Sequence, residues 1–297
     1  MSENRFRKEY SEMLGGSSPF PAWEVNPVPH ELINEEQTVW RYTTVPQLIN
    51  SLRKSDAAGH ISLHFTRTSW FDDEDDFEGT VPKKNIQNKM ENLENFQRSN
   101  SELDVEKHLE NQYGGQLPDT EDVDKKGAME KLRDLVYLNC WTAKSLESNP
   151  MWYAYTNDST GVAIKSTVGS LVDSISDWGG KLFYGQVRYI DFEEAQFPLS
   201  PIQHYFLKRR EFVEEQEFRL AMTFKQTPAM LNPTDTESMR SPPDDDYLDV
   251  TAGLNSLASE IIVHPQSDPY LKPMLEDVLE KYQIDSELVS HSSLRPR

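Results

Sequence analysis

Short apolar segments separated by polar turns recur along most of the 297-residue chain. Within many of them apolar and polar residues alternate, which is typical of a strand with one buried face. The pattern predicts strands at 38–43, 61–66, 135–142, 161–166, 181–192, 216–224, 247–250 and 260–263. Short strands of this kind between short helices favour an α+β fold. We expect a mixed, mainly antiparallel sheet with flanking helices.

Helices are predicted where capping residues or apolar residues at helical spacing occur. Thr44 and Pro46 begin one helix, and Asn149 and Pro150 begin another that reaches Thr156. The clearest apolar stripe predicts a helix at 269–283. Another helix is expected at Pro201–Phe212, which would leave Lys208, Arg209 and Arg210 in solvent. The residues expected in the core are Trp152, Val162, Ile164, Leu275 and Leu279.

The polar character of the chain changes in two places, which predicts its organisation. Residues 1–36 contain four closely spaced prolines and are expected to form an irregular arm. Residues 37–297 are expected to form a single α+β domain. Inside that domain, residues from about 80 to 126 are long polar stretches, and we interpret them as a helical acidic insertion. Its predicted helices lie around 85–98, 102–112 and 122–133.

The composition of the chain limits the kinds of partner that it is expected to bind and the cell compartment in which it is expected. The net charge of −20 disfavours binding to nucleic acids and suggests a source with a salty cytoplasm. No apolar run approaches the roughly 20 residues of a membrane span. The N-terminus has no apolar core of a secretory signal. With one cysteine, Cys140, there is no intrachain disulfide, and a reducing cytoplasm is the expected location.

Several well-known motifs of catalysis are missing from the sequence. There is no nucleotide-binding glycine loop, no H-E-x-x-H helix and no nucleophile elbow. The seven histidines show no ligand spacing, and the acidic run Asp72–Asp76 lacks the alternation and glycine of a calcium loop. We therefore predict no metal site.

Four segments carry a family resemblance, and Asn139–Thr167 is the most specific part of it. They are WRYTTVPQLINSL, HFTRTSWFDDEDDFEG, LNCWTAKSLESNPMWYAYTNDSTGVAIKST and KRREFVEEQEFRL. Over about residues 38–290 the chain resembles the prokaryotic domain-of-unknown-function family numbered twenty-nine seventy-one. It departs from the family at Asp75–Gly79, where DDFEG replaces Asp-Pro-Phe-Glu-Gly. The resemblance implies an order of elements and no activity.

Charged and aromatic residues inside predicted strands and helices supply a candidate site. Arg41 is expected to form either a structural ion pair, for instance with Glu78 or Glu217, or an anion clamp. Alternation places Glu215, Glu217 and Arg219 on one face, either as a surface ion-pair ladder or as the lining of a cleft. Trp152 and Tyr155 belong to an aromatic cluster that forms either core or pocket. We predict one polar cleft, lined by Arg41, Glu78, Tyr155 and Glu217.

The first functional hypothesis is an NAD-using enzyme. Arg41, then Ser166–Thr167, then Glu215-x-Glu217 resembles the residue order of ADP-ribosyltransferases. The resemblance implies catalytic roles for Arg41, on the pyrophosphate, and for Glu217, which would stabilise an oxocarbenium ion. It also implies NAD as cofactor, with Tyr155 stacked on nicotinamide.

The alternative hypothesis is a non-catalytic sensor or interaction module in stress or phage defence. Its aromatic pocket would bind a small molecule or a protein. The candidate ligand-binding residues under both hypotheses are Glu78, Trp152, Tyr155, Ser166, Glu215 and Arg219.

If the acidity is an adaptation to salt, the protein should become more stable as salt rises from low to molar concentration. Added ions screen the repulsion among the charges that sum to −20. Melting temperatures measured across that range check this prediction, and a flat series would contradict it.

Overall fold

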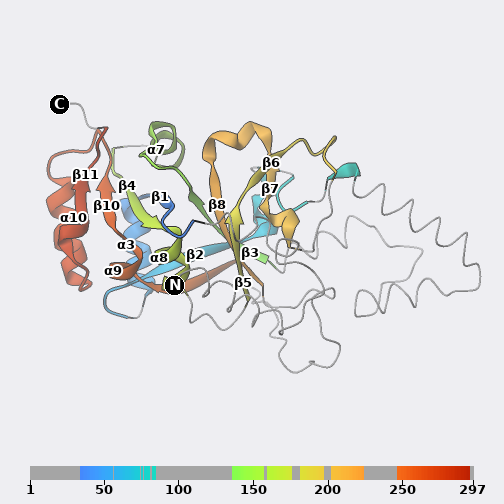
Figure 1. The fold of residues 1–297 in the computed structure, drawn as a ribbon. Coiled ribbons are helices and arrows are strands. Elements are labelled where there is room, and N and C mark those ends of the chain that lie inside the picture. The colour runs from blue at the N-terminus through green and yellow to red at the C-terminus, as the bar shows by residue number, and fades with distance from the viewer. Residues whose placement is uncertain are drawn as a thin grey trace, which may run out of the picture.

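The computed structural model describes residues 34–55, 57–73, 75, 77–80, 82–84, 136–156, 159–175, 181–196, 202–223 and 246–294. Nine strands of the described part form one sheet, and two more form a small separate sheet. Helices flank the large sheet (Figure 1), so the predicted α+β class is confirmed. The predicted insertion lies almost wholly outside the described residues, as does the arm up to residue 33.

The large sheet has a central path of seven strands. In spatial order they are β11 (Val289–His291), β10 (Glu260–Val263), β4 (Gly161–Thr167), β1 (Thr38–Thr44), β3 (Val136–Thr142), β2 (His60–Arg67) and β9 (Tyr247–Gly253). A branch adds β8 (Glu217–Thr223) to β3, and β5 (Lys181–Gln186) to β8. Only β10 and β11 pair in parallel within this sheet, which confirms its mainly antiparallel character.

Helices cover the two faces of this sheet unequally. The larger core cluster lies on one face and receives buried residues from α3 (Val45–Lys54), α8 (Val168–Ser174), α9 (Leu254–Leu257) and α10 (Leu271–Lys281). On the other face, α7 (Asn149–Thr156) packs Met151 and Trp152 against Trp40 and Tyr42. In Figure 1, α7 accordingly lies on the upper side of the sheet, with α8 and α9 below it.

The sheet divides at β3, because β1 and β2 share one edge of that strand. β1 pairs with its end at Trp40 and Thr142, and β2 pairs with its beginning. Two polar side chains serve main-chain carbonyls where the strands diverge: Arg41 donates to the carbonyl of Cys140, and Asn139 donates to the carbonyl of His64. Backbone groups left without ladder partners need such bonds when they are buried.

Two sequence predictions are wrong, and both concern the chain around β8. The strand predicted at 181–192 breaks at Val187, whose N–H donates to the carbonyl of Glu217 at 2.8 Å. After the break, β6 (Arg188–Ile190) pairs in parallel with β7 (Leu207–Arg209) in the small sheet. The single α-helix predicted at Pro201–Phe212 is instead a short 3₁₀ helix, η3 (Gln203–Phe206), followed by β7 and by a second 3₁₀ helix, η4 (Arg210–Glu215). Tyr205, Phe206 and Leu207 are consecutive and all buried, which a one-sided helix cannot achieve.

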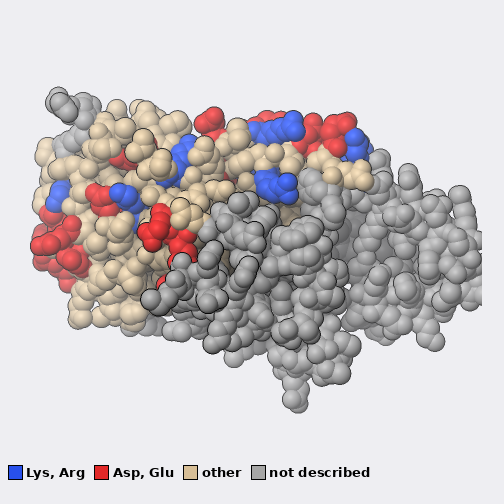
Figure 2. Space-filling view, viewed as in Figure 1, with Lys and Arg blue, Asp and Glu red and all other residues tan. Residues whose placement is uncertain are grey.

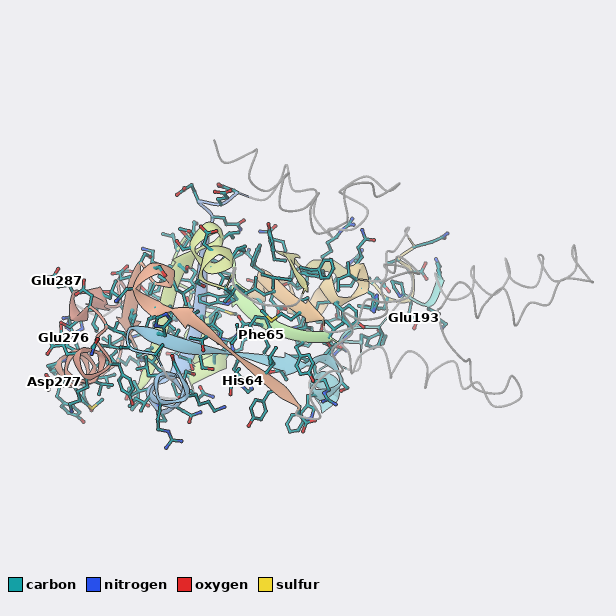
Figure 3. All side chains as sticks on the ribbon, turned by 90° about the horizontal axis from the view of Figure 1, so that it is seen from below. His64, Phe65, Glu193, Glu276, Asp277 and Glu287 are labelled. Atoms are coloured by element: carbon teal, nitrogen blue, oxygen red, sulfur yellow. The ribbon has the colours of Figure 1, made fainter. Side chains whose placement is uncertain are left out.

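The predicted core is confirmed. Trp152, Val162, Leu275 and Leu279 are fully enclosed, and Ile164 is 2% exposed. In Figure 3, Glu276, Asp277 and Glu287 lie together at one end of the described part of the chain, and Glu193 lies far from them. Acidic side chains of the described residues therefore occur on distant elements.

Replacing Leu275 by alanine should lower the free energy of unfolding by about 2–5 kcal/mol, because it leaves a cavity in the larger core cluster. A urea titration measures the loss. Met274→Ala is the matched control, since Met274 lies on the same helix but is 40% exposed. Equal losses for the two variants would contradict the assignment of Leu275 to the core.

Candidate functional site

A buried cluster of charges lies where β8 begins. The alternation of β8 puts Phe218, Leu220 and Met222 in the larger core, and therefore Glu217 and Arg219 on the opposite face. Arg219 is 1% exposed and stands beside Cys140 of β3 in the register of the two strands. A buried guanidinium has to be neutralised and hydrogen-bonded, and its surroundings meet both requirements.

Arg219 is enclosed by two carboxylates and a carbonyl. Its Nη1 and Nη2 atoms donate to the two carboxylate oxygens of Glu78, the second at 2.9 Å. Nε and Nη2 donate to the two carboxylate oxygens of Glu217 at 3.0 and 2.9 Å. Nη1 also donates to the carbonyl of Tyr205 at 2.6 Å. The planar guanidinium thus binds two carboxylates in bidentate fashion.

A second cation lies between the cluster and solvent. Lys208 of β7 reaches Glu215 at 2.7 Å and Glu217 at 3.4 Å. The hydroxyl of Tyr189, from β6, accepts the main-chain N–H of Glu217 at 2.8 Å. Lys208 is therefore not the solvated helix residue that the sequence predicted. It is a partly buried strand residue with two carboxylate partners.

The surroundings separate the acidities of the glutamates. Burial would raise the pKa of Glu217, but Arg219 and Lys208 outweigh burial and lower it to about 2. Burial raises the pKa of Glu78, which Arg219 offsets only in part and Glu217 reinforces. Burial, reinforced by Glu217, also raises the pKa of the Cys140 thiol well above its ordinary value. Glu217 is therefore the more acidic of the two carboxyl groups that bind Arg219.

A tight turn holds Glu78 in place. The turn at 77–79 ends in Gly79, which has a φ of +68°, a conformation that glycine adopts without strain. A Cβ on Gly79 would stand 2.5 Å from Thr68 Cγ2, so a larger residue does not fit. Just before the turn, Asp75 pairs with Arg209 at 2.8 Å. The DDFEG segment is therefore held against β7 and β8 by two ion pairs.

Arg41 and Ser166 lie on the other face of the sheet. Arg41 stands opposite Ile164 of the larger core, whereas its neighbour Trp40 shares a face with Thr142 and Glu217. Ser166 is buried and donates its hydroxyl to the carbonyl of Leu257 at 2.6 Å. The structure therefore does not bring Arg41 and Ser166 to Glu217, and their described bonds serve the backbone.

The two aromatic candidates differ from each other. Trp152 is fully buried, with ring contacts to Tyr42 and His264, and belongs to the core. Tyr155, the next-to-last residue of α7, is 46% exposed. Burial of its hydroxyl raises the pKa of Tyr155, and Glu215 and Glu217 raise it further. Of the expected cleft, the structure thus gathers Glu78 and Glu217 through Arg219, with Tyr155 in electrostatic range and Arg41 elsewhere.

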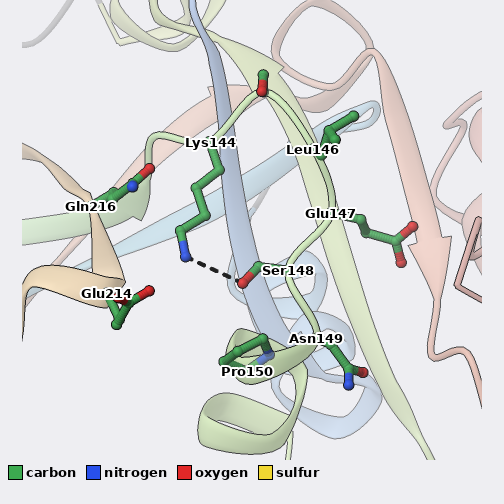
Figure 4. Close-up of a pocket in the computed structure, with 9 residues that line it drawn as sticks. Lys144, Leu146, Glu147, Ser148, Asn149, Pro150, Glu214 and Gln216 are labelled. Carbon is green, nitrogen blue, oxygen red and sulfur yellow. Dashed lines mark hydrogen bonds between the residues drawn. The ribbon is translucent and has the colours of Figure 1, made fainter.

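An open groove of about 430 Å³ lies beside this cluster, between residues 144–150 and η4. Lys144, Ser148, Glu214 and Gln216 are directed toward the same space, whereas Glu147 points away from it (Figure 4). Lys144, Glu214 and Gln216 are not among the residues that the sequence predicts for a site. The chain offers no local pattern that marks them, because the two walls come together only through the pairing of β3 with β8.

The loop that forms one wall of the groove is fixed from behind by aromatic side chains. Trp40 Nε1 donates to the carbonyl of Lys144 at 2.8 Å, and the hydroxyl of Tyr42 accepts the N–H of Ser148 at 2.8 Å. Glu147 accepts bonds from Trp152 Nε1 at 2.9 Å and from the N–H of Ser293 at 2.9 Å. The backbone is thereby held while Lys144, Ser145 and Leu146 face outward.

Basic and acidic side chains alternate along the edge that contains η4 (Figure 2). Within the described ranges, no cluster of His, Cys, Asp or Glu could hold a metal ion. No helix in the part of the chain that the structure describes is long and apolar enough to span a membrane.

Comparisons with protein-family models, curated proteins and solved structures find no match to this chain. The family resemblance and the ADP-ribosyltransferase resemblance thus stay predictions.

Glu217→Gln should lower the free energy of unfolding at neutral pH by about 2 kcal/mol. A pKa of about 2 in the folded state, against 4.5 ordinarily, corresponds to about 3 kcal/mol. Release of Glu78 from a neighbouring like charge returns part of that amount. Because the folded pKa is depressed, this stabilisation is present above pH 4.5 and is lost as the pH falls toward 2.

Urea titrations at several pH values check this prediction. The difference between wild type and variant should shrink as the pH falls below about 5. Glu214→Gln is the matched control, since Glu214 lies three residues earlier, in η4, and is exposed, so the stability of this variant should equal that of the wild type. A difference that is constant with pH would show that charge is not its cause.

Proposed function

We propose that this protein is a non-catalytic binding module, a sensor that takes a small polar molecule into the groove beside η4. The observation that carries the proposal is the construction of the groove loop. Trp40 and Tyr42 hold its backbone and Glu147 ties it to Trp152, while Lys144 and Glu214 on the groove lining form no ion pair with another described residue. Holding the binding groups in place beforehand reduces the entropy lost when a ligand binds.

The dimensions and lining of the groove support this function. A volume of about 430 Å³ lies in the range of small-molecule sites, roughly 300–1,000 Å³. The lining mixes one cation, two carboxylates, amides and hydroxyls with the exposed Leu146. Such a mixture suits a polar ligand that carries some apolar surface.

The buried charge cluster supports binding over catalysis. Both carboxylate oxygens of Glu217 are hydrogen-bonded to Arg219, and Lys208 approaches one of them as well. A glutamate held in this way is already neutralised, so it has little left to offer a developing positive charge. We assign the cluster the role of holding η4, and with it one wall of the groove, in place.

An NAD-using transferase is the second candidate, and Tyr155 is the observation that favours it. Its ring is half-exposed at the surface while its hydroxyl lies in the field of Glu215 and Glu217. A ring in that position could stack on nicotinamide with a carboxylate close by. In this candidate Arg41 and Ser166 have no part, because they occupy the opposite face.

The overall charge fits a ligand other than nucleic acid. A chain of net charge −20 repels a phosphate backbone, and its single cysteine favours the cytoplasm as its location. A small molecule is less affected, because local groups such as Lys144 decide its binding.

The proposal predicts that at least one class of small polar molecule stabilises the wild-type protein. The panel consists of amino acids, dicarboxylates, diamines, nucleotides and NAD, each tested by its effect on the melting temperature at low and high salt. A bound ligand should raise that temperature by about 2–4 °C for each kcal/mol by which it stabilises the folded state, and this stabilisation grows with the ratio of ligand concentration to Kd. Lys144→Met, which changes only the groove, should abolish the rise.

Two outcomes decide against the binding module. One is a panel in which no compound raises the melting temperature. The other is a rise with NAD that persists in Lys144→Met and disappears in Tyr155→Ala, accompanied by consumption of NAD. The second result would favour the transferase.

A further inference from the structure

Resting on the binding function proposed above, we propose that the groove recognises a zwitterion, a free amino acid or short peptide with both ends charged. Lys144 would bind the carboxylate of the ligand, and Glu214 would bind its ammonium group. Gln216 would bind polar atoms between the two ends.

The two walls of the groove carry opposite charges that do not meet. Lys144 belongs to the loop after β3 and Glu214 to η4, and both line the same space (Figure 4). Neither forms an ion pair with another of the described residues, and within the described part of the chain the Lys144 ammonium donates to Ser148 Oγ at 3.4 Å. A cation and an anion held apart across a groove are complementary to a molecule that carries both charges.

Two other carboxylates near the groove already have hydrogen-bond donors of their own. Glu147 is directed away from the groove toward Ser292 and Ser293. Glu215 is bound by Lys208 at 2.7 Å. Lys144 and Glu214 are thus the charged lining residues left for a ligand, and their charges sum to zero. A dianion, a diamine or a nucleotide would leave one of them facing a like charge or no charge.

Gln216 supplies independent support, because its backbone is strained. Its φ of 43° and ψ of 55° lie in the left-handed region, which glycine adopts more readily than a residue with a Cβ. Glycine would serve the turn better, and the carbonyl that accepts the N–H of Ala143 at 2.7 Å belongs to the backbone. The exposed amide of Gln216 therefore has a use other than folding, and it faces the groove.

Two apolar side chains line the groove together with these polar groups, Leu146 and Pro150. Leu146 is 76% exposed, so its side chain is accessible to a ligand. It can cover part of an aliphatic side chain, so an apolar amino acid is the appropriate probe.

Calorimetry with three probes tests the zwitterion. L-leucine carries both charges, N-acetyl-L-leucine lacks the ammonium group, and L-leucinamide lacks the carboxylate. Leucine should bind the wild type at least about tenfold more tightly than either blocked compound, because each blocked compound lacks one of the two charged groups that the groove would bind.

Single substitutions assign each charge to its partner. Glu214→Gln should weaken leucine about tenfold and leave N-acetylleucine unchanged, while Lys144→Met should weaken leucine and leave leucinamide unchanged. Gln216→Gly should raise the melting temperature and weaken leucine. Glu211→Gln is the matched control, because Glu211 is exposed on η4 but does not line the groove, and it should bind leucine like the wild type.

The results distinguish the proposal that the ligand is a zwitterion from the proposal that the groove binds a small polar molecule. Equal binding of leucine and either blocked compound overturns the zwitterion, as does an unchanged affinity in Glu214→Gln. So does failure of leucine to bind when another panel compound binds in a way that requires Lys144, and that result leaves the binding function standing. If no compound binds at all, both proposals fail together.

Discussion

The structure around β8 depends on the neutralisation of one buried cation, Arg219. A guanidinium in the interior needs negative charge and acceptors on every donor, and no single carboxylate supplies both. Glu217 comes from the same strand, whereas Glu78 lies 141 residues earlier in the chain. The requirement therefore joins the DDFEG turn to β8. It explains why Gly79 is glycine, since only a residue without a Cβ lets that turn lie against Thr68.

The division of the sheet is a second constraint, and it determines the hydrogen bonds of Arg41 and Asn139. β1 and β2 meet different ends of β3, so part of that strand's edge has no neighbouring ladder. Arg41 and Asn139 bond to the main chain there. The presence of a charged residue, Arg41, between apolar neighbours of β1 is therefore explained by a backbone carbonyl that needs a donor. The same strand placement that suggested an anion clamp in the sequence is what an arginine needs to reach the carbonyl of Cys140.

The sequence predicts those parts of the fold that depend on local pattern. Alternation finds β1, β2 and β8, and the apolar stripe finds α10, because each reflects one buried face. It fails at 201–212, where Tyr205, Phe206 and Leu207 are all buried because small elements enclose them from several sides. It finds Glu78, Glu217 and Arg219 as unusual charges but cannot tell which face of the sheet each occupies. The faces follow from strand order, and strand order is a long-range property.

The groove is missed for the same reason, yet it is tied to the cluster through three consecutive residues. Glu215 binds Lys208, Gln216 takes the left-handed conformation, and Glu217 binds Arg219. With both of its neighbours held by cations, Gln216 cannot relax toward an ordinary backbone conformation without breaking an ion pair. The cluster therefore maintains the strain at Gln216. The ion pairs of the cluster thus fix the position of Gln216 in the groove wall. In this way a buried ionic network that performs no chemistry can still determine what the surface beside it binds.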